Sequence, residues 1–304
     1  MANTPSQHAS ENAVTLLGFI FALLAAIGFS AKAIFVKLAY VYPVDAVTLL
    51  ALRMAFSAPI FLFLAIWFGM SKESVTLNRN DWFSVICLGL LGYYLSSLLD
   101  FLGLQYISAG LERLILFLYP TIVVVLTSLY FSKKIEKKTI LAMLLSYFGI
   151  ALVFLQNITM IQTGVVLGSL LVFASTISYA VYLIGAGQSI ARIGGMKFMA
   201  YAMSVASVAT LIQFAAIHPL SKLKLPFHVY ELGMAMAIFS TVLPAFFLAA
   251  SIRRMGSGRT SLIGSIGPVA TIYMAHVFLG ETVSVLQIAG SALVLMGVLS
   301  ITIQ

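Results

Sequence analysis

Five charged side chains stand inside otherwise apolar runs of this sequence: Lys32, Arg53, Asp100, Glu112 and Arg113. At the centre of a membrane-spanning helix, Arg, Lys or Asp costs about 2.5 to 3.5 kcal/mol on insertion scales, so such residues usually face a cavity or a partner. Groups of this kind can bind a charged solute, and buried carboxylates can take up a proton near neutral pH. They are the first candidates for a functional site.

Each candidate has an alternative structural interpretation. Arg53 lies about nine residues inside its run, roughly 13 Å at 1.5 Å per residue, which is too deep to reach the membrane surface. Lys32 is about six residues from the end of its run, so its side chain either lines a pore or extends to the interface. Asp100, Glu112 and Arg113 fall near one end of a helical hairpin, where Arg113 paired with an acidic residue would join two helices.

Aromatic side chains form a second set of candidates. Tyr94 and Tyr119 fall in apolar runs near the charged residues, and Tyr179 falls in a later run. Tyrosine hydroxyls and ring faces bind polar organic solutes, and they also pair with Ser and Thr between packed helices. We expect these three residues to form aromatic walls of a binding site, with helix packing as the alternative.

The signatures of other chemistry are missing from the sequence. It has no P-loop, no dinucleotide fingerprint and no HExxH pair, and its histidines are scattered at His8, His218, His228 and His276. We interpret the one cysteine, Cys87, as a packing residue. An embedded enzyme would need a nucleophile, a carboxylate pair or a metal cluster at one depth. We therefore predict no catalytic residue, metal site, cofactor or enzyme activity.

Composition places these residues in a bilayer. The chain is 62% hydrophobic and 9% charged, and a soluble globule of this composition would expose large apolar patches. A spanning helix needs about 20 apolar residues. Ten such segments occur, from Leu16 to Leu38, Val44 to Phe68, Trp82 to Leu102, Ala109 to Leu129, Lys138 to Leu155, Gly164 to Ile190, Lys197 to Ile217, Tyr230 to Ile252, Arg259 to Phe278 and Ser284 to Thr302. Long continuous runs favour helices over the alternating strands of a barrel.

The chain also contains a weak internal repeat. The stretches Gln105 to Val153 and Arg253 to Ile301 align without a gap at a spacing of 148 residues, which pairs Pro120 with Pro268. Five spans separate corresponding points, and an odd number inverts the second copy. We expect both prolines to kink their helices, because proline removes a backbone hydrogen bond.

We therefore predict an all-α polytopic membrane protein with ten transmembrane helices in two inverted five-helix repeats. The repeats occupy residues 16–155 and 164–302, and residues 1–15 form a polar, disordered cytoplasmic tail.

Lysine and arginine gather in one set of loops. With a cytoplasmic N-terminus, the outer loops hold only Lys222 and Lys224, and the inner loops hold Lys72, Arg79, Lys133, Lys134, Lys137, Lys138, Arg192, Lys197, Arg253, Arg254 and Arg259. The positive-inside rule then places both termini in the cytoplasm of a multi-pass protein of the inner, or plasma, membrane. The net charge of +8 fits anionic lipid headgroups and requires no nucleic acid partner.

Three stretches resemble EamA-type members of the drug/metabolite transporter superfamily. GFSAKAIFVK from Gly28 and LLALRMAFSAP from Leu49 are similar to the first two spans, and GPVATIYMAHVFLGETVSVLQIAGSALVLMGVLSI from Gly267 is similar to the last two. The resemblance covers essentially the whole chain. It implies ten helices in two inverted repeats, a central solute path, and transport of small metabolites or amino acids, frequently export, without ATP.

The first repeat departs from the family pattern at one turn. Ser132 and Lys133 stand where the second repeat has Gly280 and Glu281. This difference weakens a coupling role for Glu281 and favours a helix-capping role.

These features predict a secondary transporter that exports a small polar metabolite, such as an amino acid or a related solute, by alternating access through a central cavity. The five charged residues would carry a net charge of +1, which favours zwitterionic or anionic solutes. Proton-coupled and facilitated transport both fit the sequence. The alternative is a membrane-embedded receptor or scaffold that binds a solute without moving it. The expected partners are the solute and the bilayer; small residues would permit a homodimer but serve internal packing equally well.

Overall fold

The computed structural model describes residues 5–70, 75–131, 137–159 and 164–302, and over these ranges the chain is helical with no β-strand. The helices are α1 (Pro5–Ala39), α2 (Ala46–Met70), α3 (Arg79–Gly89), α4 (Ser96–Gly103), α5 (Ala109–Leu116), α6 (Tyr119–Phe131), α7 (Lys137–Thr159), α8 (Val165–Ile193), α9 (Gly195–Ile217), α10 (Phe227–Ala237), α11 (Leu243–Met255), α12 (Ser257–Gly264), α13 (Gly267–Leu279) and α14 (Val285–Thr302). Two π-helices, η1 (Leu90–Leu95) and η3 (Ile238–Val242), and a 3-10 helix, η2 (Leu220–Leu223), complete the described chain.

Among the described residues, seven helical segments are long and apolar enough to cross a membrane. They are Leu16–Ala39, Ala46–Met70, Arg79–Gly103, Ala109–Tyr130, Val165–Ile193, Gly195–Ile217 and Phe227–Met255. Three shorter apolar helices, Ile140–Phe154, Gly267–Leu279 and Val285–Gly297, lie where the sequence predicts the fifth, ninth and tenth spans. The all-helical membrane class is confirmed, and the count of ten spans stays a prediction.

The first helix is longer than the sequence predicts. It begins at Pro5, so residues 5–15 are helical, whereas we expected a disordered segment before Leu16. A helix formed in an apolar span gains one hydrogen bond for each residue added, and proline is well tolerated at a helix start. Other expectations fall on Lys72, Ser132, Lys133 and Lys134, which lie outside the described residues.

Proline sets the helix boundaries inside two of the predicted spans. Pro120 and Pro268 are each the second residue of a helix, α6 and α13 respectively. Helix α5 ends at Leu116 and α12 ends at Gly264, in each case four residues before the proline. This is the position whose carbonyl a proline ring obstructs. At each expected kink the α-helix is therefore interrupted by two turn residues, 117–118 before Tyr119 and 265–266 before Gly267.

The element boundaries repeat at the spacing seen in the sequence. Five pairs of elements begin 148 residues apart: α3 and α10, η1 and η3, α5 and α12, α6 and α13, and α7 and α14. The third and eighth predicted spans thus each contain a π-helical turn, and the fourth and ninth each contain a break. The inverted relation of the two halves stays a prediction.

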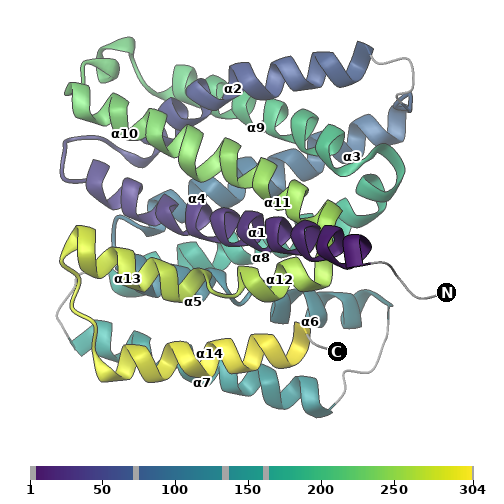
Figure 1. Ribbon diagram of the computed structural model, residues 1–304. Coiled ribbons are helices and arrows are strands. Elements are labelled where there is room, and N and C mark those ends of the chain that lie inside the picture. The colour runs from purple at the N-terminus through teal and green to yellow at the C-terminus, as the bar shows by residue number, and fades with distance from the viewer. Residues whose placement is uncertain (1–4, 71–74, 132–136, 160–163, 303–304) are drawn as a thin grey trace.

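Helix α1 runs through the middle of the bundle, with α2 and α9 on one side and α13, α14 and α7 on the other (Figure 1). It packs against α11 and α13, while α2 packs on α9, α4 on α8 and α7 on α14. Small residues permit close approach: a methyl group added to Gly149 or Gly290 would lie 2.5 Å from the other's carbonyl oxygen. The described start of α1 and end of α14 lie at the same end of the bundle (Figure 1).

Candidate functional site

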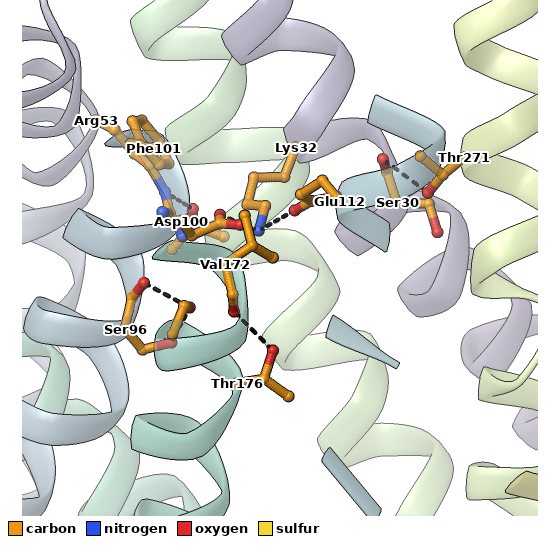
Figure 2. A network of polar contacts seen from close by, with 12 residues as sticks. Ser30, Lys32, Arg53, Ser96, Asp100, Phe101, Glu112, Val172, Thr176 and Thr271 are labelled. Atoms are coloured by element: carbon orange, nitrogen blue, oxygen red, sulfur yellow. Dashed lines mark hydrogen bonds and ion pairs between the residues drawn. The ribbon is translucent and has the colours of Figure 1, made fainter. Parts of the chain in front are cut away.

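Three of the predicted site residues form one buried ion cluster (Figure 2). The Nζ atom of Lys32, on α1, lies 2.5 Å from Oδ2 of Asp100 and 3.1 Å from Oε1 of Glu112. Asp100 is 2% exposed and Glu112 is fully buried. Lys32 therefore points into the bundle and not to the membrane interface. We call these three residues the triad.

The turn between α4 and α5 brings both carboxylates of the triad to the ammonium group of Lys32, which lies between them (Figure 2). Ser108 caps α5 by accepting a hydrogen bond from the amide of Leu111, as expected for a serine N-cap. The ammonium group of Lys37, further along α1, donates to the carbonyl groups of Leu104 and Ile107 at 3.2 and 3.0 Å. Two lysines of α1 thus hold this hairpin, one through carboxylates and one through backbone carbonyls.

Two expectations about these residues were wrong. The acidic side chains pair with Lys32 from the first span, and not with Arg113 across the hairpin. The sequence also gave no reason to expect two carboxylates at one depth, yet Asp100 and Glu112 contact the same ammonium group. Both errors concern partners that are far apart in the chain.

Arg53 is anchored on one side and has an unpaired donor on the other. Its Nε atom donates to Oγ1 of Thr241 in η3 at 2.9 Å, and its guanidinium lies over the ring of Phe101, 5.6 Å from the centroid. The Nη1 atom is buried and has no hydrogen-bond partner among the described residues. A buried unpaired guanidinium donor is costly unless a ligand or water satisfies it.

Arg113 lies against the break between α12 and α13. Its guanidinium fits over Gly267, where an added methyl group would lie 2.6 Å from Nη2 of Arg113. The Nε atom is buried and, within the described part of the chain, has no hydrogen-bond partner. The absence of a side chain at Gly267 therefore creates the space that Arg113 occupies.

Tyrosines form a cluster beside these charges. The hydroxyls of Tyr93 and Tyr182 are 2.8 Å apart, and the ring of Tyr179 lies 5.5 Å from Tyr182 and 5.6 Å from Tyr119. The predicted walls Tyr119 and Tyr179 thus lie together, while Tyr94 has no hydrogen bond or ring contact with the described residues. We call Tyr93, Tyr119, Tyr179 and Tyr182 the tyrosine cluster.

A cavity of about 440 Å³ lies between α6 and α8. Its lining consists of Val123, Thr127, Tyr130, Ile184, Gly185 and Gln188, so it does not reach the charged residues. Tyr119 and Tyr179 precede this lining by about one turn on the same two helices. The tyrosine cluster therefore stands between the cavity and Arg113.

The arrangement suits binding of a polar molecule. Across the described residues, no three His, Cys, Asp or Glu side chains lie close enough together to hold a metal ion, and Cys87 is a free, half-buried thiol. The chemistry on offer consists of two unpaired guanidinium donors, an ammonium shared by two carboxylates, and tyrosine hydroxyls.

Comparison with known proteins identifies the relatives of this chain. The sequence model of the EamA-like transporter family matches residues 16–155 and 166–303. The chain belongs to the EamA-like transporter family. It is thus a multi-pass membrane protein from a family of transporters, as the resemblance of its first and last spans predicted.

The EamA-like chain has relatives of similar length. The uncharacterized transporter YcbK of Bacillus subtilis (strain 168) is 29% identical over 279 residues, which cover 90% of this chain and 88% of the relative. The uncharacterized transporter YyaM of the same organism is 27% identical over 82% of each chain. The crystal structure of a protein 19% identical to this one superimposes with a TM-score of 0.63 over 96% of this chain and 98% of the other, which shows a shared fold.

Sequence analysis of the EamA-like chain missed several residues of the site. Thr241 holds Arg53, and Tyr93 and Tyr182 complete the tyrosine cluster. A neutral threonine in an apolar run carries no signal, because hydroxyls normally bond to their own helix. The two tyrosines were detectable as intramembrane aromatics, but their orientation was not.

Proposed function

We propose that this EamA-like protein is a secondary transporter that exports a small polar metabolite, an amino acid or a related organic solute. The observation that carries the proposal is a pair of membrane-buried arginines, Arg53 and Arg113, each with an unpaired guanidinium nitrogen. Such donors are satisfied by an acidic group. A passing solute would supply that group for part of the cycle.

The chain offers a path with two differently built ends. At one end the triad and the carbonyl contacts of Lys37 join α1 to the α4–α5 hairpin. At the other end a cavity opens between α6 and α8. Alternating access would exchange these closed and open ends around a bound solute. The helix breaks before Pro120 and Pro268 would let the halves of two spans move separately.

The net charge of the site favours one class of solute. Lys32, Arg53 and Arg113 against Asp100 and Glu112 give a net charge of +1 when all five are ionised. The triad holds one oxygen of each carboxylate against Lys32. The arginines each keep an unpaired donor for an anionic group, and Oδ1 of Asp100 and Oε2 of Glu112 keep unpaired acceptors for a cationic group. We therefore propose zwitterionic or anionic solutes with a carboxylate on the arginines and the organic part on Tyr119 and Tyr179.

The proposal includes ten spans in two inverted repeats, with a first unit over residues 16–155 and a second over 164–302. It places residues 1–15 and both termini in the cytoplasm of an inner, or plasma, membrane. Three arginines support this orientation. Arg79 begins α3, Arg192 pairs with Asp81 of the same helix at 2.7 Å, and Arg253 lies near the end of α11. The start of α3 and the end of α11 lie at the end of the bundle where α1 begins (Figure 1). A homodimer would use further contacts between small residues on the outside of the bundle.

The experiment compares metabolites released by cells that express the native protein, Arg113→Ala, Arg79→Ala or an empty vector. Arg79 is an exposed arginine at a helix end, so its variant controls for loss of a positive charge. We expect one zwitterionic or anionic solute to be enriched by the native protein and Arg79→Ala, and lost with Arg113→Ala. Preferred export of a quaternary cation would refute the charge argument.

A second function is a receptor or scaffold that binds the same solute without moving it. The unpaired arginine donors fit binding as well as transport. Purified protein in sealed liposomes distinguishes the two, because only a transporter releases trapped labelled solute. Binding without release would favour the receptor, and conversion of the solute to a product that depends on Glu112 would indicate catalysis by the carboxylate pair.

A further inference from the structure

Glu281 makes a contact that links distant parts of the chain. Its carboxylate accepts hydrogen bonds from the backbone amides of Ala109, at 2.9 Å, and Gly110, at 3.5 Å. These are the first two amides of α5, whereas Glu281 belongs to the turn between α13 and α14. The expected helix cap is therefore real, but the capped helix lies 172 residues away in sequence.

The turn after α13 positions the carboxylate of Glu281 against α5. Helix α13 ends at Gly280, whose φ of 66° is in the left-handed region that favours glycine. The amide of Glu281 then donates to the carbonyl of Ala275 at 3.2 Å, and Nδ1 of His276 lies 3.0 Å from the carbonyl oxygen of Glu281. Backbone bonds on both sides of the residue hold the turn, so its side chain is free to cap α5.

The cap completes the first turn of α5. Ser108 accepts a hydrogen bond from the amide of Leu111, and Glu281 accepts from the amides of Ala109 and Gly110. A negative charge at a helix N-terminus interacts favourably with the helix dipole. Helix α5 is thereby fixed at its start, and Glu112 of the triad lies one turn further along the same helix. The cap and the triad hold the same end of the bundle closed.

We propose that Glu281 is the latch of a gate at this end of the solute path. The inference rests on the proposed transport by alternating access. In the state described here the latch is engaged while the opposite end carries the cavity between α6 and α8. For a solute to leave at the latched end, the α13–α14 turn must separate from α5, so both hydrogen bonds to Glu281 must break.

The position that corresponds to Glu281 in the first repeat cannot form the same latch. The residue 148 positions before Glu281 is Lys133, and an ammonium group has no lone pair with which to accept a bond from a backbone amide. The glutamate nearest to Lys133 in the sequence is Glu136, three residues later. The latch proposed here is therefore the one that Glu281 forms.

The test measures access to a buried thiol. In a Cys87→Ser background, Ala275→Cys reports the latched end, because Ala275 is 1% exposed and lies one turn from the end of α13. Ala186→Cys, equally buried beside the cavity lining, reports the other end. A membrane-impermeant maleimide is applied to each face of sealed vesicles, with the native latch or with Glu281→Gln.

We expect Glu281→Gln to speed labelling at position 275 about tenfold, as lost charge-assisted bonds shift the balance of states, and to leave labelling at 186 unchanged or slower. Ser284→Ala is the matched control, since it removes the hydroxyl that caps the amide of Gln287 in the same turn and keeps the carboxylate of Glu281. Unchanged labelling at 275 would overturn the latch. Equal acceleration at both positions, or an equal effect of Ser284→Ala, would also overturn it, because the whole fold would then have loosened.

Flux keeps this inference separate from the proposed function. Labelling requires no solute, so a tenfold change at position 275 in a protein that releases no metabolite would support the latch and refute transport. Export by the native protein with no change in labelling would support transport and refute the latch. Glu281→Asp retains the charge on a shorter side chain and should label between the native protein and Glu281→Gln.

Discussion

Replacement of Lys32 by methionine tests whether the triad holds the bundle together. At 2.5 and 3.1 Å, and with an effective dielectric constant of about 20, each ion pair of Lys32 corresponds to roughly 5 to 7 kcal/mol of attraction before the cost of burial. Removal of one partner from a buried ion pair typically costs about 3 to 5 kcal/mol, because the remaining charge is left uncompensated. We expect a loss of this size in the free energy of unfolding of Lys32→Met.

A second substitution distinguishes loss of the ion pairs of Lys32 from loss of its side-chain packing. Glu112→Gln removes one of the two carboxylates that Lys32→Met leaves facing each other. The double variant should therefore be more stable than Lys32→Met alone, with a coupling of about 0.5 to 3 kcal/mol. Denaturant unfolding of the native protein, the two single variants and the double variant, all in one detergent, gives the four free energies of unfolding from which this coupling is calculated.

Lys37→Met is the matched control on the same helix. Lys37 also donates two bonds to the α4–α5 turn, but its acceptors are the carbonyl groups of Leu104 and Ile107. Its loss should destabilise the protein without any relief from Glu112→Gln. If the effects of Lys32→Met and Glu112→Gln simply add, or if Lys32→Met is as stable as the native protein, the triad is not the electrostatic centre described above.

Three further substitutions test individual contacts. Gly267→Ala should displace the guanidinium of Arg113 and raise the KM for the exported solute about tenfold, as expected for a lost bond to a charged group, and transport kinetics measure it. Asp45 caps α2 through the amide and hydroxyl of Thr48 at 2.9 and 2.8 Å. Burial raises the pKa of Asp45, but the bonds from Thr48 and two nearby cationic side chains outweigh it, so the pKa lies below its ordinary value of 3.8. This stabilisation is present above the unfolded-state pKa and is lost as the pH falls through the folded-state pKa. Asp45→Ala should therefore cost about 0.5 to 2 kcal/mol at neutral pH. In unfolding measurements, the difference from the native protein should shrink as the pH falls below 3.8 and vanish below the folded-state pKa of Asp45. Gly290→Ala should separate α7 from α14 and cost about 1 to 3 kcal/mol, measured in the same assay.

Sequence patterns predict best the features that depend on neighbours in the chain. The apolar runs locate the helices to within a few residues, because a span must bury its own backbone polar groups in lipid. The helix breaks coincide with Pro120 and Pro268, since proline obstructs a carbonyl four residues earlier, whereas Pro59 lies inside α2 without a break. The π-helices η1 and η3 carry no comparable signal, and nothing in the apolar pattern distinguishes them from α-helix.

Features that depend on distant contacts were harder to predict. The sequence identified Asp100 and Glu112 but assigned them the wrong partner, because Lys32 is 68 residues from Asp100 and could equally have reached the interface. Tyr93 and Tyr94 are neighbours, yet only Tyr93 joins the tyrosine cluster. Successive residues on a helix point in different directions, and only the packing of the third span, where both lie in the π-helix η1, decides which of them faces the site.

The two halves of the chain share their helix boundaries but not their buried charges, and this difference bears on the mechanism. The residues 148 positions after Lys32, Asp100 and Glu112 are Ala180, Leu248 and Thr260, so the second half has no counterpart of the triad. If the halves are inverted, as proposed, the two ends of the path share helix breaks and π-helical turns, but only one end holds a triad of this kind. To open that end, the protein must separate Lys32 from its carboxylates, and water or a charged solute must replace them. Binding of a solute at the triad can then offset the cost of opening this end, whereas the other end opens without separating a counterpart of the triad.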